Sequence, residues 1–317
     1  MKKINLALGA GGTKGFAHIG VIRQLEKEGF QIAAIAGTSV GGIVGSLYAL
    51  GHSTDEIERF AKKLDYSQMF FRGEGDAPSL LGLGGLYKLL DEIVGYSKIS
   101  DSKIRFAVTA VDTESGQEIV FDIGSVSEAV KATTAVPGIF PSRQLENLNL
   151  VDGGVLDPVP VSTARWLLPD NPVIAVNLTP PMSDWQHLPR IDVPPYVPIP
   201  KFLMEQLNHL RLGKAMHVFI NSIEITTNTI AELRLKIDQP DVIINPKVHK
   251  YTMFQKVDID ELISLGEQAV IEQRENLKEV FSNWARVNRW FKVVRPPGLL
   301  VSELKKQSAG ADIRENS

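Results

Sequence analysis

Short apolar runs alternate with helical patterns along the first half of the chain. The runs that predict strands are 4–8, 32–36, 104–111, 118–121, 148–151 and 173–178. Between them, apolar residues at helical spacing predict helices over 15–28, 40–50, 53–64 and 126–134. The polar link "DTESGQ" between two of the runs is typical of a hairpin turn. Strand–helix alternation of this kind favours a mostly parallel sheet covered by helices on both faces.

The second half has a different pattern. Residues 179–200 contain seven prolines, so they cannot form a helix or a central strand. Helical patterns follow over 201–221, 228–236 and 260–284, with a short strand inside "DVIINP". We therefore divide the chain into an α/β part (1–178), a Pro-rich connection (179–200), a mainly helical part that packs on the core (201–298) and a disordered tail (299–317).

The composition of the chain excludes several classes of protein and kinds of site. The 317 residues are 44% hydrophobic and 22% charged, which permits a sizeable core. A net charge of −3 argues against a general nucleic-acid binder, and the absence of cysteine excludes disulfides, thiolate metal sites and cysteine nucleophiles. The apolar run Ile4–Leu8 is too short for a secretory signal, and no run approaches the roughly 20 residues that span a bilayer. We expect a cytoplasmic protein, peripheral at a membrane at most.

A first glycine cluster, "GAGGTKG" at 9–15, stands between a predicted strand and a predicted helix. It is not a P-loop, because Lys14 precedes Gly15 instead of a Ser or Thr. It also fails the dinucleotide fingerprint, which requires glycine at position 14 and an acidic residue where Gly37 stands. The remaining interpretation is an oxyanion hole, since glycines at a helix start leave backbone N–H groups free to approach a ligand.

A second cluster, "GTSVG" at 37–41, places Ser39 between two glycines at a strand-to-helix corner. One interpretation is an ordinary helix start capped by Thr38 or Ser39. The other is a nucleophile elbow, the turn that exposes a serine hydroxyl above a sheet.

A carboxylate, Asp152, ends the strand in "NLVDGGVLDP" and is followed by two glycines. By itself this is also a common turn sequence. None of the six histidines has a comparable position at a strand end. The acidic residues are scattered and the DGG loop lacks calcium-loop spacing, so we expect no metal site.

Together, "GGTKG" at 11–15, "GTSVG" at 37–41 and "DGG" at 152–154 resemble the patatin-like phospholipases, as does "TTAVPGIFPS" at 133–142. The resemblance covers about residues 4–165, and the ordered set is far more specific than any one motif. It implies a three-layer α/β/α fold with a mostly parallel central sheet and a helical C-terminal extension. One departure is Ala10, where many members have a third glycine; it matters only if that position needs positive φ.

The resemblance implies a serine lipid acyl hydrolase of the phospholipase A, lysophospholipase or esterase type, without a cofactor. Its substrate would be a phospholipid or another acyl ester. Ser39 would be the nucleophile and Asp152 the base of a Ser–Asp dyad that forms an acyl-enzyme, with Gly11 and Gly12 as the oxyanion hole. The residues that support these motifs are Gly9, Lys14, Gly15, Gly37, Gly41, Gly153 and Gly154. A free aspartate, with a pKa of about 3.9, is a weak base, so we expect burial to raise its basicity.

The alternative is a regulatory or scaffolding protein on the same fold, with little catalytic use. The oligomeric state is not indicated.

One further stretch, "SNWARVNRWFKVVRPPG" at 282–298, combines aromatic and basic residues. Helical spacing puts Trp284, Val287, Phe291 and Val294 on one face and Arg286, Arg289 and Lys292 on the other. Helices of this composition bind membrane interfaces. The alternative is that the apolar face packs on the protein itself.

Overall fold

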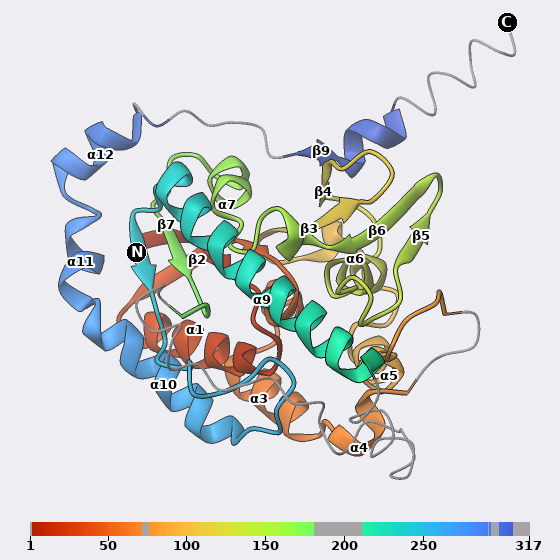
Figure 1. Ribbon diagram of the computed structural model, residues 1–317. Coiled ribbons are helices and arrows are strands. Elements are labelled where there is room, and N and C mark those ends of the chain that lie inside the picture. Colours follow the sequence, from red (N-terminus) through yellow and green to blue (C-terminus); the bar gives the residue numbers. More distant parts are fainter. Residues whose placement is uncertain (1, 72–75, 181–210, 291, 293–297, 307–317) are drawn as a thin grey trace, which may run out of the picture.

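A mostly parallel sheet forms the middle layer of the molecule, with helices on both sides (Figure 1). The computed structural model describes residues 2–71, 76–180, 211–290, 292 and 298–306. The three-layer α/β/α arrangement expected from the sequence is confirmed. The Pro-rich connection lies almost wholly outside the described residues.

Within the described residues the sheet has nine strands. They are β1 (Lys2–Leu8), β2 (Phe30–Gly37), β3 (Arg105–Asp112), β4 (Glu118–Phe121), β5 (Arg143–Leu145), β6 (Leu148–Asp152), β7 (Val173–Val176), β8 (Val242–Ile244) and β9 (Leu299–Leu300). The main order is β5-β6-β3-β2-β1-β7-β8, with β4 paired to β3 and β9 to β4. The pairs β3–β4, β3–β6 and β5–β6 are antiparallel, and the others are parallel. The predicted hairpin is the β3–β4 pair.

The helices alternate with the strands through the first half and dominate the second. They are α1 (Ala17–Lys27), α2 (Val40–Ala49), α3 (Thr54–Lys62), α4 (Tyr66–Met69), α5 (Gly84–Val94), α6 (Val126–Thr133), α7 (Val161–Leu167), α9 (Arg211–Asp238), α10 (Ile259–Glu272), α11 (Arg274–Glu279) and α12 (Asn283–Trp290). Short 3-10 helices are η1 (Gly12–Phe16), η2 (Ile99–Asp101) and η3 (Gly153–Val155). Helix α3 starts with a capping box formed by Ser53 and Glu56.

The central strand β1 is buried on both faces. Ile4, Leu6 and Leu8 pack in the main core with α1 and α2, whereas Ala7 packs with residues of α7 and α9. Asn5 points to the same side as Ala7, and its Nδ2 donates to the carbonyl oxygens of Ala164 and Leu168. A strand covered by helices on both faces needs this nearly continuous apolar run.

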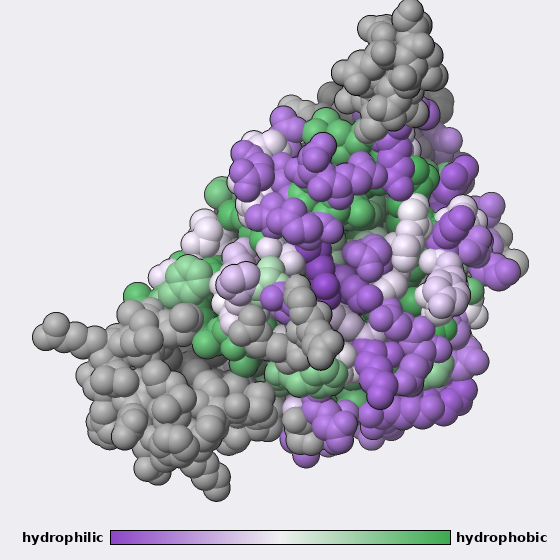
Figure 2. Space-filling model, turned by 90° about the vertical axis from the view of Figure 1, so that its right-hand side faces the viewer, coloured by the Kyte–Doolittle hydropathy of each residue, from purple (hydrophilic) through white to green (hydrophobic). Residues whose placement is uncertain are grey.

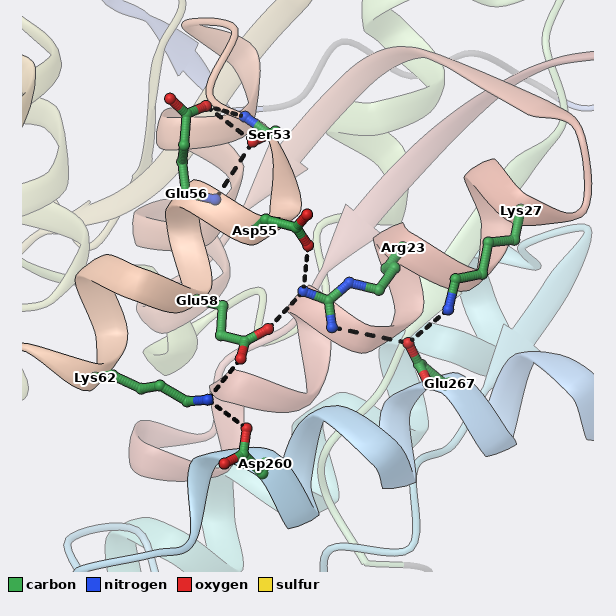
Figure 3. A network of polar contacts seen from close by, with 9 residues as sticks. All are labelled: Arg23, Lys27, Ser53, Asp55, Glu56, Glu58, Lys62, Asp260 and Glu267. Carbon is green, nitrogen blue, oxygen red and sulfur yellow. Dashed lines mark hydrogen bonds and ion pairs between the residues drawn. The ribbon is translucent and has the colours of Figure 1, made fainter.

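The second half of the chain is part of the same core. Strand β8 extends the sheet beside β7, and α10 packs directly against α1. At that contact a Cβ on Gly20 would lie 1.8 Å from the carbonyl oxygen of Ile263, so the two helices meet backbone to backbone. Ion pairs reinforce the contact: Glu267 of α10 faces Arg23 and Lys27 of α1 (Figure 3).

Three expectations for the second half are wrong in detail. The helical patterns at 201–221 and 228–236 belong to one helix, α9, where described. Ser222 and Thr229 donate their hydroxyls to carbonyls four residues earlier, so these side chains bond within the helix instead of capping a new one. The pattern at 260–284 is divided into α10, α11 and α12, and Gln273 leaves helical geometry at the first break. The segment expected to be a disordered tail begins with an ordered strand.

That ordered strand is β9, which pairs in parallel with β4. Leu300 and Val301 are buried there, and the hydroxyl of Ser302 donates to Asp122. Residues 301–306 continue as a helix. The segment 299–317 is mostly polar, so its composition did not reveal the short apolar stretch that anchors it. None of the helices in the described part is long and apolar enough to cross a bilayer.

Candidate active site

The three motifs meet at one edge of the sheet. Strands β1 and β2 are parallel neighbours, and Leu8 lies opposite Gly37, so the glycine loop and Ser39 follow at the same level. Gly37 lies opposite Val108 of β3, and two residues further along β3 Ala110 lies opposite Asp152. The strand register therefore brings Ser39 and Asp152 together across β3.

Ser39 occupies a strained corner between β2 and α2. Its φ of 56° and ψ of −125° are unusual for a residue with a side chain. Its backbone N–H donates to Oγ1 of Thr133 at 2.9 Å, which helps to hold this conformation. The Ser39 hydroxyl makes no capping bond to α2, so the interpretation as a simple helix cap does not describe its role.

The glycines on either side of Ser39 make the corner possible. A Cβ on Gly41 would lie 2.1 Å from the carbonyl oxygen of Leu8, and one on Gly37 would lie 2.6 Å from the backbone of Gly41. Thr38 fixes the other side of the turn through hydroxyl contacts with Thr109 at 2.8 Å and the carbonyl oxygen of Asp157 at 2.9 Å. A strained strand-to-helix turn of this kind is what the elbow interpretation requires.

Asp152 is buried at the end of β6, with 5% of its surface exposed. Its backbone N–H donates to the carbonyl oxygen of Ala135, and its Oδ1 accepts from the N–H of Gly154 at 2.7 Å. Burial raises the pKa of Asp152 to about 6, while hydrogen bonds from the Ser39 hydroxyl and the Gly154 N–H act in the opposite direction. The carboxylate is therefore more basic than a free aspartate, and it faces Ser39 across the end of β3.

The glycine loop after β1 is held at both ends. The N–H groups of Gly9 and Ala10 donate to Val176 and Pro158, and that of Thr13 donates to Met253. The N–H groups of Gly11 and Gly12 have no acceptor among the described residues. Two free donors beside Ser39 are what an oxyanion hole requires.

The backbone conformation of two loop residues shows how well this loop matches the family's glycine motif. Gly12 has a φ of 60°, and a Cβ there would lie 2.2 Å from the carbonyl oxygen of Met253. Ala10 is not among the described non-glycine residues with positive φ, which are Ser39, Glu146 and Gln239. The substitution of a third glycine by Ala10 therefore causes no backbone strain.

The other motif residues pack the loops together. A Cβ on Gly15 would meet the side chain of Val40 at 2.1 Å, and one on Gly153 would meet Thr109 at 2.3 Å. A Cβ on Gly9 would lie 2.9 Å from the carbonyl oxygen of Val176. Lys14 is buried, its Nζ lies 3.9 Å from Glu224 of α9, and burial lowers its pKa.

An apolar cavity opens beside Ser39 and Asp152. Its wall includes Phe70, Leu83, Phe140, Ile223, Met253 and Phe254. The rings of Phe70 and Phe140 stack, and Phe254 meets both edge to face. The outer surface on the side of α5 and β5 is mainly hydrophilic with scattered hydrophobic patches, in contrast to the cavity wall (Figure 2). The cavity suits a hydrocarbon chain better than a polar ligand.

Among the described residues, no histidine lines the cavity. His18 is fully buried and its Nε2 bonds to the carbonyl oxygen of Gly9 at 2.8 Å, so it supports the glycine loop from below. Burial lowers the pKa of His18 to about 4, which keeps the ring neutral. His52 packs edge to face on Phe60.

The described residues also contain no cluster of acidic or histidine side chains that could hold a metal.

Several supporting residues were missed in the sequence. Thr109, Thr133 and Asp157 hold the corner at Ser39 through contacts that span 71, 94 and 119 residues of chain. Thr133 lies in the segment "TTAVPGIFPS", whose family resemblance was the available signal.

The chain is similar to several known proteins. A family model described as patatin-like phospholipase matches residues 6–165. An uncharacterized NTE family protein of Mycobacterium tuberculosis, Rv1063c, is 36% identical over 179 residues, which are 56% of this chain and 49% of that protein. The lysophospholipase NTE1 of Meyerozyma guilliermondii is 30% identical over 170 residues, 51% of this chain but 12% of that protein. This chain therefore spans about half the length of the mycobacterial relative and a small part of the yeast one.

Among solved structures, VipD from Legionella pneumophila aligns with a TM-score of 0.52. The alignment covers 88% of this chain and 67% of VipD at 11% sequence identity, so it bears on the fold alone. The family match covers half of the chain and includes all three loops of the candidate site. The chain belongs to the patatin-like phospholipase family.

Proposed function

We propose that this protein is a serine lipid acyl hydrolase that uses Ser39 and Asp152 as a catalytic dyad. The observation that carries the proposal is a serine on a strained backbone corner that shares the wall of an apolar cavity with a buried carboxylate of raised pKa. Family membership and the printed activity of the yeast relative support a lipid ester as substrate.

In the proposed reaction, the Ser39 hydroxyl attacks the ester carbonyl carbon and its proton passes to the Asp152 carboxylate. The N–H groups of Gly11 and Gly12 stabilise the oxyanion. Collapse of this intermediate breaks the ester bond, and the leaving alcohol takes the proton from Asp152. Water then attacks the acyl-enzyme, again giving a proton to Asp152, which returns it to Ser39 as the fatty acid leaves.

The cavity supports the choice of an acyl chain as the bound group. Its aromatic and aliphatic wall begins at Ser39 and includes Ile223 of α9 and Met253. An acyl chain in this cavity would exclude water from Asp152 and strengthen the attraction between the oxyanion and the loop N–H groups.

A fluorophosphonate probe tests the proposal, because it modifies only a serine activated as a nucleophile. We expect the full-length protein to be labelled at Ser39 and the Ser39→Ala variant to remain unlabelled. A folded wild-type protein that neither reacts with the probe nor hydrolyses acyl esters would favour the regulatory or scaffolding alternative.

Peripheral membrane contact through α12 is a second part of the proposal. Trp284 is 73% exposed and Val287 is also exposed, while Phe291 and Val294 lie outside the described residues. Two of the three basic residues face the protein, since Arg289 and Lys292 lie 3.6 and 3.2 Å from Asp241, whereas Arg286 is exposed. The apolar residues are thus free to enter an interface.

The position of α12 limits what this contact can do. Asp241 accepts from the N–H of Val173, the first residue of β7, so α12 lies at the amino-terminal end of the parallel strands. Ser39 lies at the opposite end. A membrane bound to α12 would therefore anchor the protein and would not deliver lipid directly to the cavity.

A further inference from the structure

Helix α9 lies outside the family-model match but contributes to the candidate site. It crosses the face of the sheet opposite to α1 and α10 (Figure 1). Ile223 and Thr227 line the cavity, and Glu224 lies 3.9 Å from Lys14 beside the glycine loop. Further along the same helix, Arg234 reaches Asp157. One helix therefore contacts the cavity and two of the loops around it.

The segment Asp157–Pro158 connects all three functional loops. The N–H of Asp157 donates to the carbonyl oxygen of Gly153 in the turn after Asp152, at 2.8 Å. Its carbonyl oxygen accepts from the Thr38 hydroxyl at 2.9 Å. The carbonyl oxygen of Pro158 accepts from the N–H of Ala10, also at 2.9 Å. A shift of this segment would move the base, the nucleophile and the oxyanion loop relative to one another.

The side chain of Asp157 ties this segment to α9. It is fully buried, and its Oδ2 accepts from Nη2 of Arg234 at 3.0 Å. Its Oδ1 has no hydrogen-bond partner among the described residues. Arg234 also lies 3.2 Å from Asp238 and donates to the hydroxyl of Ser162.

Carboxylates predominate around the Asp157–Arg234 pair. Asp157 and Asp238 are near Arg234, as is Glu118 of β4. Burial and the charge of Glu118 raise the pKa of Asp157 well above its usual value, whereas Arg234 lowers it. Without Arg234, Asp157 would be either an unpaired buried charge or a neutral acid that lacks its strongest hydrogen bond.

We propose that Arg234 is a positioning residue, which acts through Asp157 to hold the nucleophile, base and oxyanion loops in their relative places. This inference rests on the proposed hydrolase function. It makes the reaction depend on a helix that the family match does not include.

The main test is Arg234→Gln in the full-length protein, assayed with a soluble acyl ester and a fluorophosphonate. We expect kcat and the labelling rate to fall by about 100-fold, because misplacement of reacting groups by about 1 Å has an effect of this size. KM should change by less than about twofold, because the cavity wall is untouched. Adding Asp157→Asn should restore much of the loss, since it removes the unpaired carboxylate.

The matched control is Arg165→Gln. Arg165 is a buried arginine that also contacts α9: it donates to the carbonyl oxygens of Asp238 and Gln239 at the end of that helix without contacting a functional loop. We expect a lower melting temperature but an unchanged kcat. Equal losses of kcat in both arginine variants, or a wild-type kcat in Arg234→Gln, would overturn the inference.

If Arg234→Gln does not fold, Asp157→Asn and Asp157→Ala are compared. Asparagine can still accept from Arg234 and alanine cannot, so kcat should fall at least about tenfold further in the alanine variant. Equal values in the two variants would contradict the inference. Absence of labelling in the wild-type protein would instead refute the proposed function itself.

Discussion

The two ends of the parallel sheet differ in the residues they carry and in how tightly these are packed. At the carboxyl-terminal end, Ser39 and Asp152 are buried, and glycines let backbone segments approach more closely than a Cβ would permit. At the amino-terminal end, Phe281 stacks on Phe30 with the Lys2 ammonium near both rings, and the neighbouring Trp284 is exposed.

This difference distinguishes a reactive region, where substitutions should be costly, from a region where substitutions should be tolerated. A buried carboxylate with a raised pKa and a serine with positive φ are costly unless the surrounding contacts enforce them. Exposed aromatic and basic side chains have little such cost, and a substitution there changes the surface alone. We therefore expect the largest effects of substitution at the carboxyl-terminal end and the smallest at α12.

Ser39→Ala should have the largest effect. Removal of the only hydroxyl proposed to attack the ester should reduce kcat by roughly 10⁴-fold or more. Hydrolysis of a chromogenic acyl ester measures this, with thermal unfolding as the check that the variant is folded. Substantial activity in a folded variant would show that the nucleophile lies elsewhere.

Asp152→Asn should also reduce kcat by several orders of magnitude, because the amide cannot accept the serine proton. Single substitutions of the six histidines are the controls, and none should approach this loss. His18→Gln is the most demanding of them, since His18 supports the carbonyl of Gly9. A histidine variant as inactive as Asp152→Asn would indicate a triad.

The pH profile should follow the ionisation of Asp152. Its pKa is raised to about 6, and the charged form is the base, so kcat/KM should be level above pH 6. Below that pH it should fall about tenfold per unit as the carboxylate becomes protonated. A fall in kcat/KM centred near pH 4 would show that burial does not raise the pKa of Asp152 in the working enzyme.

Two glycines test the contrast between the ends directly. Gly41→Ala should lower the free energy of unfolding by about 3 kcal/mol, because its Cβ would lie 2.1 Å from the carbonyl oxygen of Leu8. Gly29, just before β2 at the other end, has a φ of 81° but open space around it. Gly29→Ala should cost about 1 kcal/mol from backbone strain alone. Denaturant unfolding compares them, and equal costs would mean that the packing at Gly41 relaxes easily.

Trp284→Gln should have the smallest effect on the enzyme. Hydrolysis of a soluble ester should be unchanged, whereas sedimentation with anionic vesicles should weaken about tenfold if the side chain enters the interface. Ile271→Gln, at another exposed apolar position, is the control. Unchanged vesicle binding in Trp284→Gln would refute membrane contact through α12. Truncation after Phe281 is a poorer test, because it also removes β9 and its pairing with β4.

The sequence determined most of the strands and helices of the first half and indicated the candidate site residues. Alternating apolar runs reveal buried strands, and a motif such as "GTSVG" needs its residues at adjacent positions, so both are visible locally. Asp152 was recognisable only because its motif follows the other two in a known order. The composition of 299–317 was misleading, since two buried residues, Leu300 and Val301, anchor an otherwise polar segment.

Only the tertiary structure decided how distant residues meet. The register of β2, β3 and β6 brings Asp152 to Ser39, and no local pattern encodes register between strands that are far apart in the chain. The contact between Arg234 and Asp157 spans 77 residues and depends on where α9 crosses the sheet. The raised pKa of Asp152 is likewise a consequence of burial, which the complete packed core produces and the residue type does not.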